Sequence, residues 1–271
     1  MTSFSFLSRP VKFARLAATA LLGLAAVATA NDRHFGYVYE TATMPVGARE
    51  LEVWTTARLG HEDYYSALDH RMEFETGLTD NLQASFYMNW RNVTAADSAG
   101  NLNSAFKWQG FSTEFKYKLT DPVADAVGFG LYGELGYSTE GFELEGKALF
   151  DKRVGPVLLA ANFVGELEYE AEGDEFELEE IGLEGTFGAS YSVSRNVALA
   201  LELRSHSEIV ESELESSALF LGPTVSYTAD KWWATFTLMP QLAALKHEGG
   251  GLRDLEDHEA LEARLLFSFH L

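Results

Sequence analysis

The feature that most constrains the fold is an alternation of apolar and polar residues with a period of two, which recurs along most of the chain. In the segment 51–59, Leu51, Val53 and Leu59 share one parity, whereas Glu52 and Arg58 share the other. Successive side chains of a β-strand point to opposite faces, so each such segment predicts a strand with one apolar and one polar face.

About twelve segments of roughly ten residues follow this pattern, and ten or fourteen strands also fit. The alternation slips near Gln109-Gly110 and near Glu179-Glu180, where we predict bulges or strand ends. Mostly short connections alternate with mostly longer ones. The short ones are 78–81, 119–122, 152–156, 192–196 and 228–231, and the others are 60–67, 92–105, 138–141, 170–180, 207–217 and 246–260. We therefore predict an all-β fold, a closed antiparallel transmembrane β-barrel with short periplasmic turns and longer external loops.

The last predicted strand keeps its apolar parity to the final residue. Leu265, Phe267, Phe269 and Leu271 share that parity, and only Leu266 breaks the alternation. We expect this apolar face to contact lipid, and the strand to close the barrel by pairing with the segment 51–59.

Residues 1–30 resemble a secretory signal peptide. A basic start without acids precedes an apolar stretch that is too short to span a bilayer, and Ala28 and Ala30 frame a small-x-small cleavage site. An N-terminal membrane anchor is the disfavoured alternative, since polar residues follow the apolar run at once. We predict a signal peptide over 1–30, a periplasmic segment over 31–49 and an outer-membrane barrel domain over 50–271. The sequence leaves open whether 31–49 forms an extra strand or a lumenal plug.

The chain is strongly acidic and contains no cysteine. Its formal charge is −21, and loss of the three positive charges in residues 1–30 moves it to −24. Such a surface repels nucleic acid and favours cations. Stability must come from burial and backbone pairing, since disulfides are excluded.

Charged residues on the polar parity are the candidates for a pore lining. They are Arg58, Arg71, Glu73, Glu114, Lys116, Glu134, Glu145, Glu166, Glu184, Glu202, Arg204 and Arg264. Acids outnumber bases, so a solvated interior would concentrate cations and small cationic or neutral solutes. Opposed Arg and Glu side chains would instead brace a narrow barrel shut, and the sequence leaves both arrangements open.

The sequence gives little support for catalysis, and we predict no enzyme, no catalytic residue and no cofactor. Ser205-His206-Ser207 suggests a lipolytic site but lacks an orienting third group at recognisable spacing. Acidic residues crowd the predicted loop 170–180, and oxygen-rich clusters suit Ca²⁺ or Mg²⁺. Their spacing matches no defined Ca²⁺ loop, so a solvated acidic surface is favoured and no metal site is assigned.

The stretches ETATMPVGARELEVW (40–54) and YSALDHRMEFETGLTDNLQASFYMNW (65–90) resemble an uncharacterised family of bacterial outer-membrane barrel proteins. The chain is similar, more distantly, to putative channels encoded beside aromatic-compound degradation pathways. The resemblance covers about residues 36–91 and implies location, fold and at most a transport role. It also implies a terminal signal for the barrel-assembly machinery, although Leu271 stands where those signals usually have an aromatic residue.

We accordingly expect a monomer in the bacterial outer membrane, in contact with its lipid, that acts as a narrow passive channel for small polar or cationic solutes. The alternative is a structural or surface-interaction barrel whose acidic loops bind divalent ions, lipopolysaccharide or partner proteins.

Overall fold

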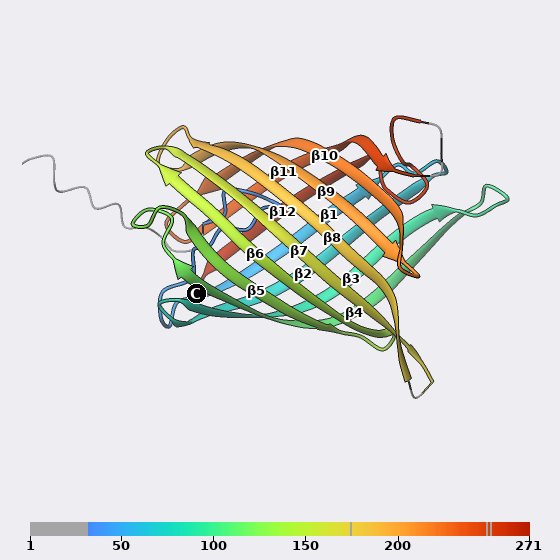
Figure 1. Ribbon diagram of the computed structural model, residues 1–271, viewed down its shortest axis with the longest axis horizontal. Coiled ribbons are helices and arrows are strands. Elements are labelled where there is room, and N and C mark those ends of the chain that lie inside the picture. Colours follow the sequence, from blue (N-terminus) through green and yellow to red (C-terminus); the bar gives the residue numbers. More distant parts are fainter. Residues whose placement is uncertain (1–31, 174, 248, 250) are drawn as a thin grey trace, which may run out of the picture.

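The structure, a computed structural model, describes residues 32–173, 175–247, 249 and 251–271. Within these residues the chain forms a closed barrel of twelve strands (Figure 1). The strands are β1 (Arg49–Leu59), β2 (Tyr65–Thr79), β3 (Leu82–Ala96), β4 (Leu102–Thr120), β5 (Gly128–Tyr137), β6 (Gly141–Val154), β7 (Val157–Glu172), β8 (Glu175–Ser192), β9 (Val197–Val210), β10 (Glu213–Thr228), β11 (Trp232–Lys246) and β12 (Leu261–His270). The predicted all-β antiparallel barrel is confirmed. The predicted cleavage-site residues Ala28 and Ala30 lie outside the described residues. Among the described residues, none belongs to a helix that is long and apolar enough to cross a membrane.

The sequence alternation becomes the two faces of the barrel wall. In β5, Tyr132 and Glu134 are buried, whereas Leu131 and Leu135 on the opposite face are exposed. Every strand carries at least one exposed large apolar side chain, for example Val53, Phe74, Phe86, Phe115, Leu131, Leu144, Phe163, Phe187, Leu199, Val225, Phe236 and Leu265. The outer surface is therefore an apolar band, as lipid-facing barrel walls are.

The barrel closes where the sequence predicts. β12 pairs with β1, with Leu51 opposite Phe269 and Leu59 opposite Leu261. The backbone N–H of Leu271 continues this edge and donates to the carbonyl oxygen of Arg49 at 2.9 Å. The outward residues of the closing strand are exposed at Leu265, Phe269 and Leu271 and half-buried at Phe267. Leu266, the exception to the alternation, is fully buried inside the barrel.

Both predicted slips are irregularities in strand pairing. The β3–β4 register shifts around Gln109, and the β7–β8 register shifts around Glu179. Gly110 takes a φ of +89° beside the first shift, a left-handed conformation that favours glycine. A Cβ atom at Gly110 would overlap the carbonyl oxygen of Tyr137, which lies at the end of β5.

We expect Gly110→Ala to lower the free energy of unfolding by about 2–4 kcal/mol, because it adds both backbone strain and a clash with a neighbouring strand. Gly146→Ala is the matched control, since an added Cβ there meets no atom within 4 Å. Urea unfolding in detergent micelles measures both variants. Equal stabilities for the two variants would contradict this explanation of the bulge.

The predicted division into short turns and long loops is only partly correct. Three predicted external loops are mostly strand, because β3 runs to Ala96, β8 begins at Glu175 and β10 begins at Glu213. Their strands stay paired along these hairpins, and Figure 1 shows the β3–β4 and β7–β8 hairpins projecting past the rest of the barrel. The connection 247–260 is the long external loop, and the turn 121–127 is longer than predicted.

Most of the N-terminal segment 32–48, up to Met44, folds into the barrel interior rather than adding a strand. Phe35, Tyr37, Val38, Tyr39 and Met44 are at most 7% exposed although they precede β1. All of these except Met44 join inward-facing wall residues in three apolar clusters. Figure 1 shows this blue segment winding within the barrel near the end that carries the C-terminus. We call residues 33–44 the plug.

Candidate functional site in the barrel lumen

All twelve predicted lining residues lie on the inner side of the wall, at two different levels. Eight of them line a large cavity: Arg58, Arg71, Glu134, Glu145, Glu166, Glu184, Arg204 and Arg264. The remaining four are buried outside that cavity: Glu73, Glu114, Lys116 and Glu202. A role for any of them in passing a solute stays a prediction.

Glu202 holds the middle of the plug. Its carboxylate accepts the backbone N–H groups of Gly36 at 2.8 Å, Tyr37 at 2.8 Å and Val38 at 3.0 Å. The hydroxyls of Thr224 and Thr237 also donate to it. Glu202 is 0% exposed, so its charge is balanced by five donors rather than by water. The residue thus anchors the plug and does not line an open path.

Three further wall residues fix the rest of the plug. Asn162 on β7 accepts the N–H of Tyr39 at 2.7 Å and donates to its carbonyl oxygen at 2.9 Å. Asp151 on β6 accepts the N–H and hydroxyl of Thr41 at 3.0 and 2.7 Å. Gln83 on β3 accepts the N–H of Met44 at 3.1 Å. The plug therefore satisfies its backbone with side chains from widely separated strands.

Aromatic rings and cations pack together at the upper surface of the plug. The ammonium of Lys147 lies 4.1 Å from the ring centre of Tyr39, and the guanidinium of Arg264 lies 3.9 Å from that of Tyr37. Arg33 lies 4.2 Å from the ring of Tyr39 and 4.8 Å from that of Trp54. A cation–π contact that is shielded from water contributes about 2 kcal/mol of stabilisation, so these contacts hold the plug side chains in place. We call this layer of rings and cations the floor.

Above the floor lies a cavity of about 780 Å³. Tyr37, Tyr39 and Trp54 line its base, and residues of the external connections, such as Ser138 and Asp257, line its other end. The cavity volume is that of a small-solute site. It is thus a vestibule that reaches from the external hairpins down to the plug.

Ion pairs cross-brace much of the vestibule wall, on β1–β3, β5, β8, β9 and β12. Arg58 binds Asp69 at 2.7 Å, Glu262 at 2.7 Å and also Glu259. Arg204 binds the same Glu262 at 2.8 Å and also pairs with Glu184. Arg91 pairs with Asp69, and Arg71 pairs with Glu134. The bracing that the sequence left open is present, yet it leaves a cavity in the lumen rather than filling it.

The opposite side carries acids that the bases do not reach. Glu143, Glu166 and Glu168, on β6 and β7, line the vestibule within 4.8 Å of one another, counted between one carboxylate oxygen from each. Among the described residues, none forms an ion pair with these three. A solute in the vestibule therefore meets unpaired acids on β6–β7 and ion-paired walls on β1–β3, β5, β8, β9 and β12.

The long external loop folds back over the mouth of the vestibule. Gln241 joins it to β11, donating to the carbonyl oxygen of Asp254 at 2.6 Å and accepting the Asp254 N–H at 2.8 Å. Burial lowers the pKa of His258, which lies 3.1 Å from the hydroxyl of Ser216. Burial raises the pKa of Glu259 to about 7, although Arg58 opposes the shift. The loop is therefore part of the structured lining.

The Ser205-His206-Ser207 pattern does not assemble into a nucleophile and base. The hydroxyl of Ser207 lies 2.7 Å from that of Ser217, whereas His206 contacts Glu208 at 3.2 Å inside the vestibule. Neighbouring residues of a strand point to opposite faces, which keeps the serine hydroxyl away from the imidazole.

The plug contacts are the functional feature that the sequence pattern failed to reveal. One signal was present, because large apolar side chains occur on the polar parity at Trp54, Leu149, Leu158 and Leu266. These residues form the wall side of the apolar clusters around Tyr39 and Phe35. Inward apolar residues in a barrel wall indicate a filled interior.

Comparisons with known proteins agree with the geometry at the level of fold. The family described as "Family of unknown function (DUF6662)" matches residues 27–271. The chain is similar to the COG4313 outer membrane channel from Pseudomonas putida F1, with 15% identity, a TM-score of 0.60 and coverage of 84% of this chain and 97% of that one. It is also similar to the NanC porin, with 11% identity, a TM-score of 0.55 and coverage of 82% and 100%. No curated protein matches the sequence.

Proposed function

The chain belongs to the DUF6662 family of unknown function, and from this premise we propose that it is an outer-membrane barrel acting as a narrow passive channel for small polar or cationic solutes. The apolar outer band supports a place in a bilayer. Exposed Tyr117, Tyr191 and Tyr227 near the short turns, and Tyr137 near the opposite rim, support it further as interface aromatics. The two channel and porin structures share its fold.

The observation that carries the proposal is the vestibule of about 780 Å³ that ends on the plug. A barrel with a purely structural role does not need a cavity that is lined by charged side chains and extends to one end of the barrel. The plug sets the limit on conductance, because its aromatic and cationic surface forms the floor of that cavity. Displacement of the plug then opens the path.

The acidic side of the vestibule supports the solute class. Glu143, Glu166 and Glu168 have no cationic partner among the described residues, so their field attracts cations and repels anions. The unpaired acids attract a charged group of the solute, and the ion-paired wall offers hydrogen-bonding groups to its polar part.

Planar-bilayer recording with the refolded chain tests the channel. We expect small unitary currents at neutral pH with a preference for cations. The absence of current in this protein, together with its absence in a variant whose plug is displaced, would refute the channel.

Glu166→Lys should lower the ratio of cation to anion permeability about two- to five-fold, because it places a positive charge on the unpaired acidic wall. Reversal potentials in a salt gradient measure the ratio. Glu175→Lys makes the same charge change at an exposed site on β8 outside the vestibule lining, and should have little effect. Equal effects of the two substitutions would remove Glu166 from the conducting path.

A surface-interaction barrel is the second candidate, and the extended acidic hairpin of β7 and β8 favours it. Glu175, Glu177 and Glu179 are exposed there, beyond the wall. Such a surface suits divalent ions bridging to lipopolysaccharide, or a basic partner protein. Binding of lipopolysaccharide vesicles that requires Mg²⁺ and is lost on replacing these three residues with Gln would favour this role, and unchanged binding would count against it.

A further inference from the structure

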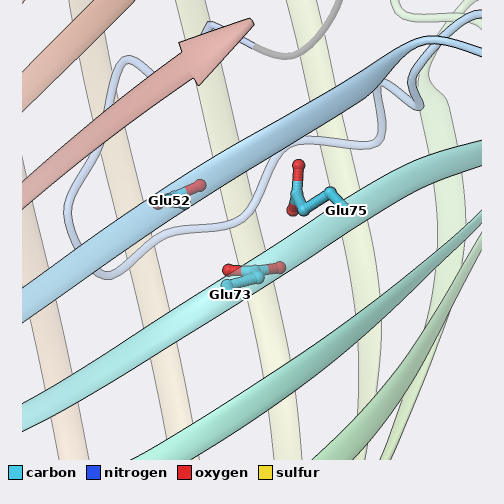
Figure 2. Close-up of side chains that lie close together, drawn as sticks. All are labelled: Glu52, Glu73 and Glu75. Atoms are coloured by element: carbon cyan, nitrogen blue, oxygen red, sulfur yellow. The ribbon is translucent and has the colours of Figure 1, made fainter. Parts of the chain in front are cut away.

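A second feature of the barrel interior lies in the wall formed by β1 and β2, where three glutamates gather (Figure 2). Glu52 lies on β1, and Glu73 and Glu75 lie on β2. One carboxylate oxygen from each lies within 4.8 Å of the other two. Their exposed fractions are 0%, 1% and 5%, so water does not screen them.

Two of these carboxylates are unsatisfied. Both oxygens of Glu52 and both oxygens of Glu73 are buried without a hydrogen-bond donor among the described residues. The register sets Glu52 directly opposite Glu73, so two like charges face one another across the strand pair. Buried carboxylates without partners are strongly unfavourable, and the arrangement calls for a positive ligand.

The nearby Glu50 is also buried, but its carboxylate has hydrogen-bond donors in the wall. Its carboxylate accepts hydrogen bonds from Ser268 at 2.8 Å and from the indole N–H of Trp233 at 3.1 Å. The wall thus supplies donors to a buried glutamate two residues away and supplies none to Glu52. This difference indicates that the partner of Glu52 and Glu73 is a bound ligand rather than a donor group of the protein.

In the part of the chain that the structure describes, Glu52 and Glu73 also lack an ion pair with the nearest guanidinium. Arg33 of the plug interacts electrostatically with Glu52 and Glu73, yet within the described residues it forms no ion pair with either. Glu75 differs from the other two, because its carboxylate accepts a hydrogen bond from the side-chain amide of Gln83 at 3.0 Å. Glu75 and Lys116 line a cavity of about 20 Å³, which is room for one water or small ion beside the group.

We propose that Glu52, Glu73 and Glu75 bind a hard divalent cation, with Ca²⁺ preferred to Mg²⁺. Carboxylate oxygens are the ligands that both ions favour, and three glutamates offer up to six oxygens. Ca²⁺ accepts bidentate carboxylates in irregular geometry, whereas Mg²⁺ keeps several waters that a buried site of this size does not hold. The ion would join β1 to β2 beside the plug, a role separate from conduction.

The test uses the mature chain refolded from inclusion bodies into an uncharged detergent, so that no lipopolysaccharide contributes binding. After treatment with EDTA, equilibrium dialysis against ⁴⁵Ca²⁺ should give about one ion per chain, with weaker competition by Mg²⁺. Glu52→Gln combined with Glu73→Gln should weaken Ca²⁺ binding at least about ten-fold, because it removes two charged ligands. Glu175→Gln combined with Glu177→Gln makes the same charge change on the exposed hairpin and should leave binding intact.

Thermal unfolding supplies a second measurement, in which the substitutions are expected not to lower stability in EDTA but to abolish stabilisation by Ca²⁺. In EDTA the Glu52→Gln, Glu73→Gln variant should be at least as stable as the parent, since it loses a like-charge contact, and so it should fold. Added Ca²⁺ should raise the Tm of the parent and leave that of the variant unchanged. The proposal is overturned if the parent binds no Ca²⁺ at about 10 mM, if the variant binds as the parent does, or if acid alone stabilises the parent and Ca²⁺ does not.

Discussion

Replacement of the plug, residues 33–44, by a flexible Gly-Ser segment of equal length should raise the single-channel conductance about ten-fold or more. The plug side chains Phe35, Tyr37, Tyr39 and Met44 fill the interior, and the replacement has no side chains that can pack there. Bilayer recordings of the two proteins under identical salt measure the change. The barrel itself should persist, because the strand pairing from β1 to β12 does not include these residues.

A single substitution should reproduce part of this effect. A Cβ at Gly188 would overlap the ring of Phe35, so Gly188→Val should displace the plug and increase current. Gly185→Val lies on the same strand where an added Cβ meets nothing within 4 Å, and it should behave as the parent. Unchanged conductance in both the Gly-Ser replacement and Gly188→Val would show that the plug does not limit the path.

Substitution of Glu202 by Ala should weaken docking of the plug by about 3–5 kcal/mol. It leaves the buried N–H groups of Gly36, Tyr37 and Val38 without an acceptor, and each buried unsatisfied donor costs about 1–3 kcal/mol. Hydrogen exchange at residues 35–39 is the direct measurement, and protection there should fall while protection in the strands is kept.

Glu202→Gln is the graded control for this experiment. It retains one carbonyl oxygen as acceptor but loses the charge, so the loss of protection should lie between those of the parent and Glu202→Ala. Protection at residues 35–39 that is the same in Glu202→Ala and the parent would mean that apolar packing alone holds the plug.

The wall of the barrel was predictable because a two-faced strand must alternate. Both bulges follow from the same rule, since a slip in alternation is a slip in register. The partner of the closing strand follows from closure of the sheet, which pairs the last strand with the first. The external hairpins were harder to predict, because acidic stretches such as 175–179 look like solvated loops while their alternating pattern still allows pairing.

The contacts of the plug could not be predicted from the alternation of the sequence, because they do not recur with any period. Tyr39 meets Asn162 and Thr41 meets Asp151 at sequence separations of 123 and 110 residues, and no local pattern encodes such pairings. Leu266 was the visible hint, an apolar residue on the polar parity that packs in one cluster with Tyr39 and Trp233. In the same way, the sequence predicted that Glu73 faces inward but gave no sign that Glu52 lies opposite it without a donor.

The spread of the plug contacts also orders the events of folding. Residues 33–44 leave the ribosome early, yet their partners include Gln83 on β3, Glu202 on β9 and Arg264 on β12. The full set of partners is present only after the last strand has joined the first, so a partly assembled sheet holds an incomplete docking site. Complete docking of residues 33–44 is therefore expected to follow closure of the barrel, although these residues precede every strand in the chain.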